Sequence, residues 1–347
     1  MRQYVIAILL KNWEEIEMRL KENGLIALIA LCVSWTSYAA QAPIKLRVAY
    51  PTLTGSYAVA WIAKEEQIFT KNGLDVELLF IQSSPILVAA MLAGNAPVGL
   101  TSGAPAVSSN LSGSDLVLVA SLSNVSGIAY LVTSPKITNP TQLKGKILGI
   151  DRLGGTGDFI LRRTLRKLAI DPDRDVTIRQ IGQSPVRLAA LQAGLIDGTT
   201  ITVEDKLIAE KFGLNILVDI PKAGVEVLSS GVVTTRSFIK KEEETVRRFI
   251  RSIVEGIHTY KTRKAKSIEI MSKYMKVSDP RVIDIGYDFN AQTYRQKPYP
   301  FTQGIQLVLE QLAYTNPAAK LADPERFLDA RFVKELDDNG HIDRLYK

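Results

Sequence analysis

Residues able to carry out catalysis are scarce in this chain of 347 residues. Its two histidines, His258 and His341, form no His-x-x-x-His metal motif, and no Gly-x-Ser-x-Gly elbow is present. The single cysteine, Cys32, lies in an N-terminal segment that we expect to be removed, so the remaining chain has no thiolate nucleophile and no cysteine metal ligand. We therefore expect a protein without catalytic residues, metal or cofactor.

Three loops instead combine glycine with small polar side chains, a composition that lets a ligand approach the backbone. The first loop, Tyr50 to Tyr57, leads into a predicted helix whose free N–H groups favour an anion. Its candidate ligand-binding residues are Tyr50, Thr54, Gly55, Ser56 and Tyr57. A structural alternative is that Ser56 only caps the helix and Gly55 is a turn residue.

The second loop is Thr101, Ser102 and Gly103, and the third runs from Arg152 to Asp158 with Gly155, Thr156 and Gly157 as candidates. Arg152 suits a sulfonate, nitrate or carboxylate, or it is a solvated rim residue. The third loop matches neither a P-loop nor a GxGxxG fingerprint, so it does not indicate a nucleotide. Further candidates near the predicted crossings of the chain are Asn124, Ser126, Thr202 and Glu204.

The elements that must position these loops occur twice, at an offset of 100 residues. Residues 84–94 (SPILVAAMLAG) recur as residues 184–194 (SPVRLAALQAG), with six of 11 positions identical. At the same offset Gly55 aligns with Gly155, and Ser56 aligns with Thr156. A repeat of this length equals one small domain, so the sequence predicts two similar lobes with a cleft between them.

Each copy reads as strand, helix, strand, helix, strand, the order of a parallel sheet flanked by helices. Ligands of such sheets lie beyond the carboxyl ends of the strands, where the three loops fall. Strands at 128–133 and 225–235 are predicted to carry the chain from one lobe to the other and back, and to form the hinge. After residue 237 the pattern is helical, with helices expected at 242–260, 264–274, 279–296 and 302–315.

The N-terminal segment predicts export from the cytoplasm. Residues 24–35 are apolar, follow Arg19 and Lys21, and precede the small-x-small sequence 40–42, as in a secretory signal peptide. We expect a cleaved signal at 1–42, with a possible true start at Met18, and a periplasmic or other extracytoplasmic location. The net charge of +7 is interleaved with acids, which disfavours a nucleic-acid partner.

The segment from Val48 to Pro105, the Ala-x-x-Ala-Gly ends of the repeat helices and the Gly155-Thr156 loop carry a family resemblance. The chain resembles the periplasmic solute-binding proteins of ABC importers, in the nitrate, sulfonate, taurine and pyrimidine-precursor group. One departure is Pro97, where many members carry Asp; the second copy has Asp197. The resemblance implies an α/β, two-lobed type II fold with a mainly parallel sheet in each lobe and the helical C-terminal region packed on lobe 1.

We expect lobe 1 to comprise 43–126 and 228–347, and lobe 2 to comprise 127–227. The expected function is capture of a small anionic polar solute, and the expected partners are an ABC permease and its cytoplasmic ATPase, with the binding protein a monomer. One rival is an enzyme of pyrimidine-precursor synthesis on the same fold. Another is a sensor domain that passes its closed state to a signalling partner.

Overall fold

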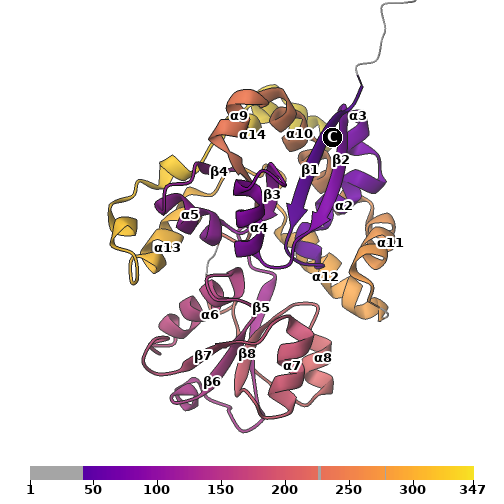
Figure 1. The fold of residues 1–347 in the computed structure, drawn as a ribbon. Helices are drawn as coiled ribbons and strands as arrows, with labels where there is room; N and C mark the ends of the chain where they lie inside the picture. The colour runs from indigo at the N-terminus through magenta and orange to yellow at the C-terminus, as the bar shows by residue number, and fades with distance from the viewer. Residues whose placement is uncertain (1–41, 226–227, 278) are drawn as a thin grey trace, which may run out of the picture. The chain divides into compact units, whose positions relative to one another are not determined.

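Two five-stranded sheets organise the chain in the computed structural model, which describes residues 42–225, 228–277 and 279–347. The first sheet, in spatial order, is β2 (Leu74–Phe80), β1 (Ile44–Tyr50), β3 (Val98–Thr101), β10 (Ser230–Thr235) and β4 (Leu116–Ser123). The second is β7 (Thr177–Gln180), β6 (Ile147–Ile150), β8 (Gly198–Thr202), β5 (Ile128–Thr133) and β9 (Asn215–Asp219). We call the first sheet with its helices lobe 1 and the second sheet with its helices lobe 2 (Figure 1).

The two sheets have the same topology. In each, the strand in fourth position runs antiparallel to its neighbours, and the other pairs among the first three strands are parallel. These fourth strands are β10 in lobe 1 and β5 in lobe 2. Each is the first strand that the chain forms after it crosses from the other lobe. The prediction of two mainly parallel sheets is confirmed.

The predicted signal peptide, apart from Ala42, lies outside the described residues. Pro43–Lys347 form one compact unit. No helix of the described residues combines the length and the apolar character needed to cross a bilayer.

The repeated segment forms α4 (Ser84–Leu92) in lobe 1 and α7 (Ser184–Gln192) in lobe 2, each with proline in its first turn. Both helices end in the same way. Gly94 and Gly194 adopt left-handed backbone angles (φ 77° and 72°), and the next N–H returns to the carbonyl of Ala90 or Ala190 at 2.9 Å. The Ala-x-x-Ala-Gly pattern therefore marks the helix ends, as predicted.

Other helices flank the sheets. In lobe 1 they are α2 (Ala58–Glu65), α3 (Ile68–Lys71) and α5 (Gly103–Leu111). In lobe 2 they are α6 (Thr156–Lys167) and α8 (Lys206–Lys211), with the short η2 (Pro140–Leu143) before β6.

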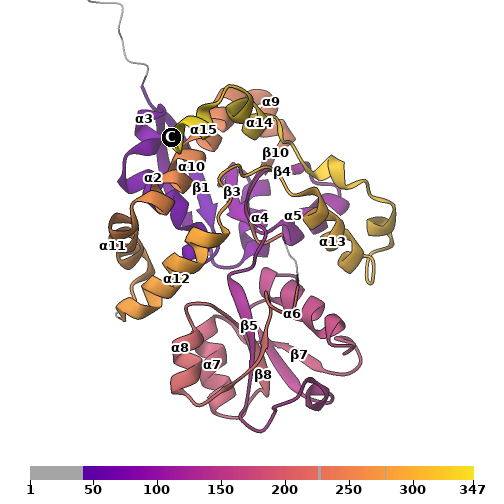
Figure 2. The same ribbon diagram turned by 180° about the vertical axis from the view of Figure 1, so that it is seen from behind.

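The C-terminal helices pack on lobe 1, as predicted (Figure 2). They are α9 (Arg236–Lys241), α10 (Glu243–Thr262), α11 (Lys264–Met275), α12 (Pro280–Thr293), α13 (Thr302–Leu312), α14 (Arg331–Asp338) and α15 (His341–Leu345), with η3 (Pro317–Leu321) and η4 (Pro324–Phe327). Helix α10 buries one face against α2 and α3, and its Phe249 stacks on Phe69 of α3 with ring centres 5.5 Å apart. Burying each such large apolar side chain contributes about 1.5–3 kcal/mol.

Four local features differ from the sequence-based expectations. Helix α5 and strand β4 were not predicted, and the return strand β10 begins at Ser230 rather than at residue 225. A 3₁₀ turn, η1 (Gly55–Tyr57), precedes α2; its N-cap is Thr54, and Ser56 caps neither helix. The alternative that Ser56 serves as an N-cap is therefore wrong.

The left-handed glycines provide a test of the repeated helix ends. A Cβ at Gly94 or Gly194 would meet nothing within 4 Å, so Gly→Ala there changes backbone strain alone. We expect G94A and G194A each to lower the free energy of unfolding by about 1 kcal/mol, measured by denaturant titration. The neighbouring Ala193→Ser, at φ −75°, serves as control and should change it by less than about 0.5 kcal/mol. Unchanged stability of both glycine variants would contradict the assigned helix ends.

Candidate functional site

Loops at the carboxyl ends of the strands in the two lobes contact each other directly. The central contact joins Gly55, at the start of η1 in lobe 1, to Glu204, just after β8 in lobe 2. The Gly55 N–H donates to Glu204 Oε1 at 3.0 Å. Both residues were candidates from the sequence, and 149 positions separate them in the chain.

Glu204 packs against α12, one of the C-terminal helices of lobe 1. A Cβ at Gly286 would come within 2.9 Å of Glu204 Oε1, so the carboxylate needs glycine at that position. Tyr294 donates from its hydroxyl to the Gly55 carbonyl at 2.5 Å, which fixes the loop that Glu204 contacts. The C-terminal helices thus shape the site as well as covering the sheet.

The Glu204 carboxylate is strongly desolvated, with only 4% of the residue exposed. Burial raises its pKa above the ordinary value of 4.5. The hydrogen bonds that the carboxylate accepts from backbone N–H groups, including that of Gly55, lower the pKa and offset part of this rise. Its second oxygen, Oε2, has no hydrogen-bond partner among the described residues. A buried acceptor without a donor is costly, so this atom would gain from a donor on a bound molecule.

A second contact between the lobes centres on Thr156, the first residue of α6. Its Oγ1 lies 2.7 Å from Ser102 Oγ and 3.2 Å from Ser84 Oγ, both in lobe 1. Thr156 and Ser102 were candidates from the sequence, whereas Ser84 was not. Ser84 opens the repeated segment, so its place at a helix start facing the other lobe was a signal that could have identified it.

Asp151, which was not a candidate, lies under the third loop. A Cβ at Gly157 would be 2.6 Å from Asp151 Oδ1, and one at Gly155 would be 3.0 Å from the Arg152 carbonyl. These glycines therefore make room for the carboxylate and for the tight turn. Burial raises the pKa of Asp151 and attraction to Arg187 offsets part of the rise, while Oδ1 has no hydrogen-bond partner among the described residues.

Three further polar atoms next to these contacts are buried without a partner in the described part of the chain: Ser83 Oγ, Thr101 Oγ1 and Asn124 Oδ1. Ser83 also has a left-handed φ of 82°, which is strained for a residue with a side chain. Strain and unpaired polar atoms concentrate where proteins bind ligands. Thr101 and Asn124 were candidates, and Ser83 was not.

Several candidates have structural partners of their own. Tyr50 packs edge-on against Trp61 with ring centres 5.8 Å apart, and burial raises the pKa of Tyr57. Leu228 covers the position where Gly103 would carry a side chain. Three further candidates form hydrogen bonds with nearby residues: Thr54 with the Thr52 hydroxyl, Ser126 with the Ile128 N–H, and Thr202 with Asp205. The Ser56 hydroxyl lies against Gly127.

Arg152 is partly exposed, and no ion pair or side-chain hydrogen bond of the described residues includes it. His258 lies edge-on against Tyr346, and His341 Nε2 is 3.3 Å from Glu255 Oε1, so both pack among the C-terminal helices. The described residues contain no group of three or more acidic, histidine or cysteine side chains arranged to hold a metal.

Comparison with known proteins agrees with this architecture. Residues 55–263, more than half of the chain, match the family model described as "NMT1/THI5 like". A candidate binding protein of Bacillus subtilis (strain 168), YtlA, is 22% identical over 262 residues, which cover 74% of this chain and 78% of YtlA.

Solved structures share the fold. The periplasmic aliphatic sulphonate binding protein SsuA of Escherichia coli superposes with a TM-score of 0.68 at 20% identity, over 82% of this chain and 92% of SsuA. The periplasmic nitrate-binding protein NrtA of Synechocystis PCC 6803 gives a TM-score of 0.69 at 12% identity, over 86% of this chain and 90% of NrtA.

An enzyme shares the fold too. The desulfurization enzyme DSZB gives a TM-score of 0.59 at 14% identity, over 85% of this chain and 99% of DSZB. The fold alone therefore does not decide between binding and catalysis. With its paired five-stranded sheets in the type II periplasmic-binding-protein arrangement and a family match over more than half its length, this chain belongs to the NMT1/THI5-like family.

Proposed function

We propose that this protein captures a small, anionic polar solute between its two lobes and delivers it to an ABC importer. The protein acts outside the cytoplasm after cleavage of a signal peptide at residues 1–42, as a monomer, and its partner is a membrane permease with a cytoplasmic ATPase. No chemistry on the solute is required. The family match and the shared fold with sulfonate- and nitrate-binding proteins support this proposal.

The observation that carries the proposal is the hydrogen bond from the Gly55 N–H to the Glu204 carboxylate. This contact supports the proposal because the Gly55 N–H at the start of η1 donates to a carboxyl oxygen that comes from the other lobe. A sulfonate or carboxylate of a solute presents the same kind of oxygen. We infer that the solute's anionic group takes the position of Glu204 on Gly55 when the lobes close around it.

The remaining polar atoms narrow the chemistry of the solute. Glu204 Oε2 and Asp151 Oδ1 are acceptors without donors, and Ser102 and Thr156 supply hydroxyls between the lobes. A solute that carries an amino or hydroxyl group beside its anionic group would satisfy both kinds of partner. Nitrate has no hydrogen to donate, so a substituted sulfonate or carboxylate fits these residues better.

Closure requires a hinge, which we assign to the two connections between the lobes. One is Asn124–Gly127, between β4 and β5, and the other lies between β9 and β10. On this assignment lobe 1 comprises 43–126 and 228–347, and lobe 2 comprises 127–227. Solute bound to one lobe and then contacted by the other shifts the equilibrium toward the closed form by its extra affinity for that form.

A solute screen tests the proposed ligand class. Thermal unfolding of the protein should show a rise in Tm that grows with concentration for aminoethanesulfonate and hydroxyethanesulfonate. Ethanesulfonate, which lacks the donor, should bind about tenfold more weakly, and nitrate more weakly still. If only solutes that lack a sulfonate or carboxylate group raise the Tm, the assignment of an anionic group to the solute is wrong.

Thr156→Val tests the contact between α6 and lobe 1. Valine keeps the shape but removes the hydroxyl that meets Ser102 and Ser84, so affinity for the best solute of the screen should fall about 3- to 10-fold in titration calorimetry. Gly155→Val combined with Thr156→Val also places a side chain against the Arg152 carbonyl, and it should abolish the solute-induced rise in Tm.

Thr177→Val, on exposed β7, is the matched control and should bind normally. Full binding by both Thr156 variants would refute the assignment of this loop to the site.

The buried carboxylate makes stability depend on pH. Because the folded-state pKa of Glu204 is raised, the folded protein holds this proton more tightly than the unfolded chain, and stability falls as pH rises above 4.5 through the raised pKa. Glu204→Gln mimics the protonated form. It should raise the Tm at pH 8 and flatten its decline between pH 5 and pH 8, while Glu77→Gln on exposed β2 should not. An unaltered pH profile in Glu204→Gln would contradict the desolvated environment.

A further inference from the structure

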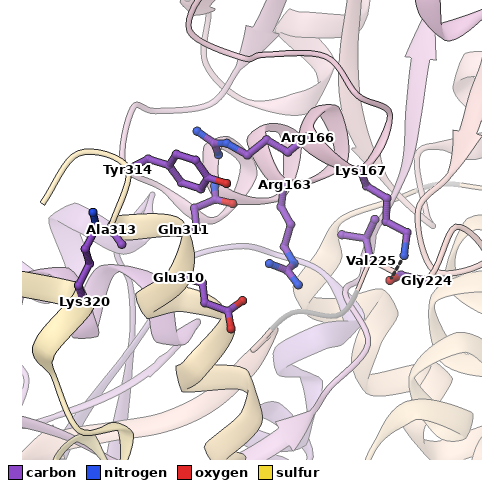
Figure 3. Close-up of a pocket in the computed structure, with 10 residues that line it drawn as sticks. All are labelled: Arg163, Arg166, Lys167, Gly224, Val225, Glu310, Gln311, Ala313, Tyr314 and Lys320. Carbon is purple, nitrogen blue, oxygen red and sulfur yellow. Dashed lines mark hydrogen bonds between the residues drawn. The ribbon is translucent and has the colours of Figure 1, made fainter. Parts of the chain in front are cut away.

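An open cavity of about 850 Å³ lies away from the solute loops, between α6 of lobe 2 and the α13–η3 segment of lobe 1 (Figure 3). Its volume is within the range of small-molecule sites. The lining residues are Arg163, Arg166, Lys167, Gly224, Val225, Glu310, Gln311, Ala313, Tyr314 and Lys320. We call this cavity the α6–α13 groove.

The groove is strongly cationic. Four of its lining residues are basic and one, Glu310, is acidic, a formal excess of three positive charges. Lys167 donates to a neutral carbonyl, that of Gly224, at 3.0 Å, and neither Lys167 nor Lys320 belongs to an ion pair of the described residues. Arg163 has interactions of its own, so the inference rests on Arg166, Lys167 and Lys320. The charges of Lys167 and Lys320 are therefore not compensated by an ion pair of the described residues, whereas Arg166 pairs with Asp173.

Arg166 is held in place before any ligand arrives. Its guanidinium stacks on the Tyr314 ring, 4.1 Å from the ring centre, and Nη2 lies 3.2 Å from Asp173 Oδ2. Asp173 is shared with Arg162, so one carboxylate faces two guanidinium groups. Arg166 Nη1 has no acceptor among the described residues. A fixed guanidinium with an unsatisfied donor is suited to bind phosphate or carboxylate oxygens.

The groove is separate from the solute loops and bridges the lobes. Arg166 lies ten residues beyond Thr156 on α6, roughly 15 Å along the helix axis. Across the groove, Gln311 of α13 donates to the Phe159 carbonyl of α6 at 3.0 Å. A molecule in the groove would therefore contact both lobes at once, at a distance from the loops that meet at Gly55 and Glu204.

We propose that the α6–α13 groove is a second binding site, for a small polyvalent anion with phosphate or carboxylate groups. Arg166 and Lys167 on α6 and Lys320 on η3 bind its oxygens. Because these residues come from different lobes, the anion stabilises the arrangement in which the lobes are in contact. The inference stands apart from solute capture, since no residue of the solute loops takes part.

Pyrophosphate and citrate are the probes, and acetate is the monovalent control. Titration calorimetry of the full chain should show binding of the two polyvalent anions and none of acetate at the same concentration. Arg166→Gln with Lys320→Gln should weaken binding at least tenfold. Glu310→Gln removes the one acid of the groove and should strengthen it.

Two matched variants separate this site from general charge and from the solute loops. Arg174→Gln with Lys241→Gln removes two exposed charges elsewhere and should leave the affinity unchanged. Thr156→Val, in the solute loops, should also leave it unchanged. The proposal is overturned if the polyvalent anions do not bind, if the control pair weakens binding as much as the groove pair, or if Thr156→Val abolishes it. In the last case the anion occupies the solute loops.

Discussion

The contact on which the site depends is a hydrogen bond between a backbone N–H in one lobe and a buried carboxylate in the other. The Gly55 nitrogen and Glu204 Oε1 lie 3.0 Å apart. Burying either group without a hydrogen-bond partner would cost free energy of folding. Their surroundings accommodate this pair: Gly286 leaves space for the carboxylate, and Tyr294 anchors the Gly55 carbonyl. The second oxygen of this carboxyl group, Oε2, has no hydrogen-bond partner among the described residues.

The internal repeat explains why such a contact exists. Each copy ends its strands in a loop that leads to a helix start, and the two copies face each other with different chemistry. Lobe 2 contributes Thr156 and two buried carboxylates, Asp151 and Glu204. Lobe 1 contributes N–H and hydroxyl groups. The carboxyl groups of this contact region thus come from lobe 2, the Gly55 N–H comes from lobe 1, and both lobes supply hydroxyls.

Sequence patterns predicted the architecture well because they depend on local chemistry. Proline and glycine at fixed offsets mark α4 and α7, and alternation of strands and helices implies the parallel sheets. The residues of the site were harder to predict from the sequence. Tyr50 and Tyr57 follow a strand end, yet their apolar rings are buried in lobe 1, since burial of aromatic surface outweighs their single hydroxyls.

Other site residues could not be predicted because distant segments place them. Gly286 and Tyr294 come from the C-terminal helices, more than 80 positions beyond Glu204, and no periodicity connects them. Asp151 follows a buried strand, as many acidic loop residues do. Only the folded structure shows that Gly155 and Gly157 pack against its carboxylate. The groove beside α6 joins segments of two lobes, so it also has no signature in the sequence.

Closure of the two lobes on a solute is the central claim, and a distance measurement between them tests it most directly. In the protein without residues 1–42, which has no cysteine of its own, spin labels at Glu77→Cys in lobe 1 and Lys211→Cys in lobe 2 would report the separation by pulsed electron paramagnetic resonance. Adding the best solute of the screen should narrow the distance distribution to one short separation, and Thr156→Val should require more solute for the same change. A distribution that does not change while the solute is bound would contradict capture by closure.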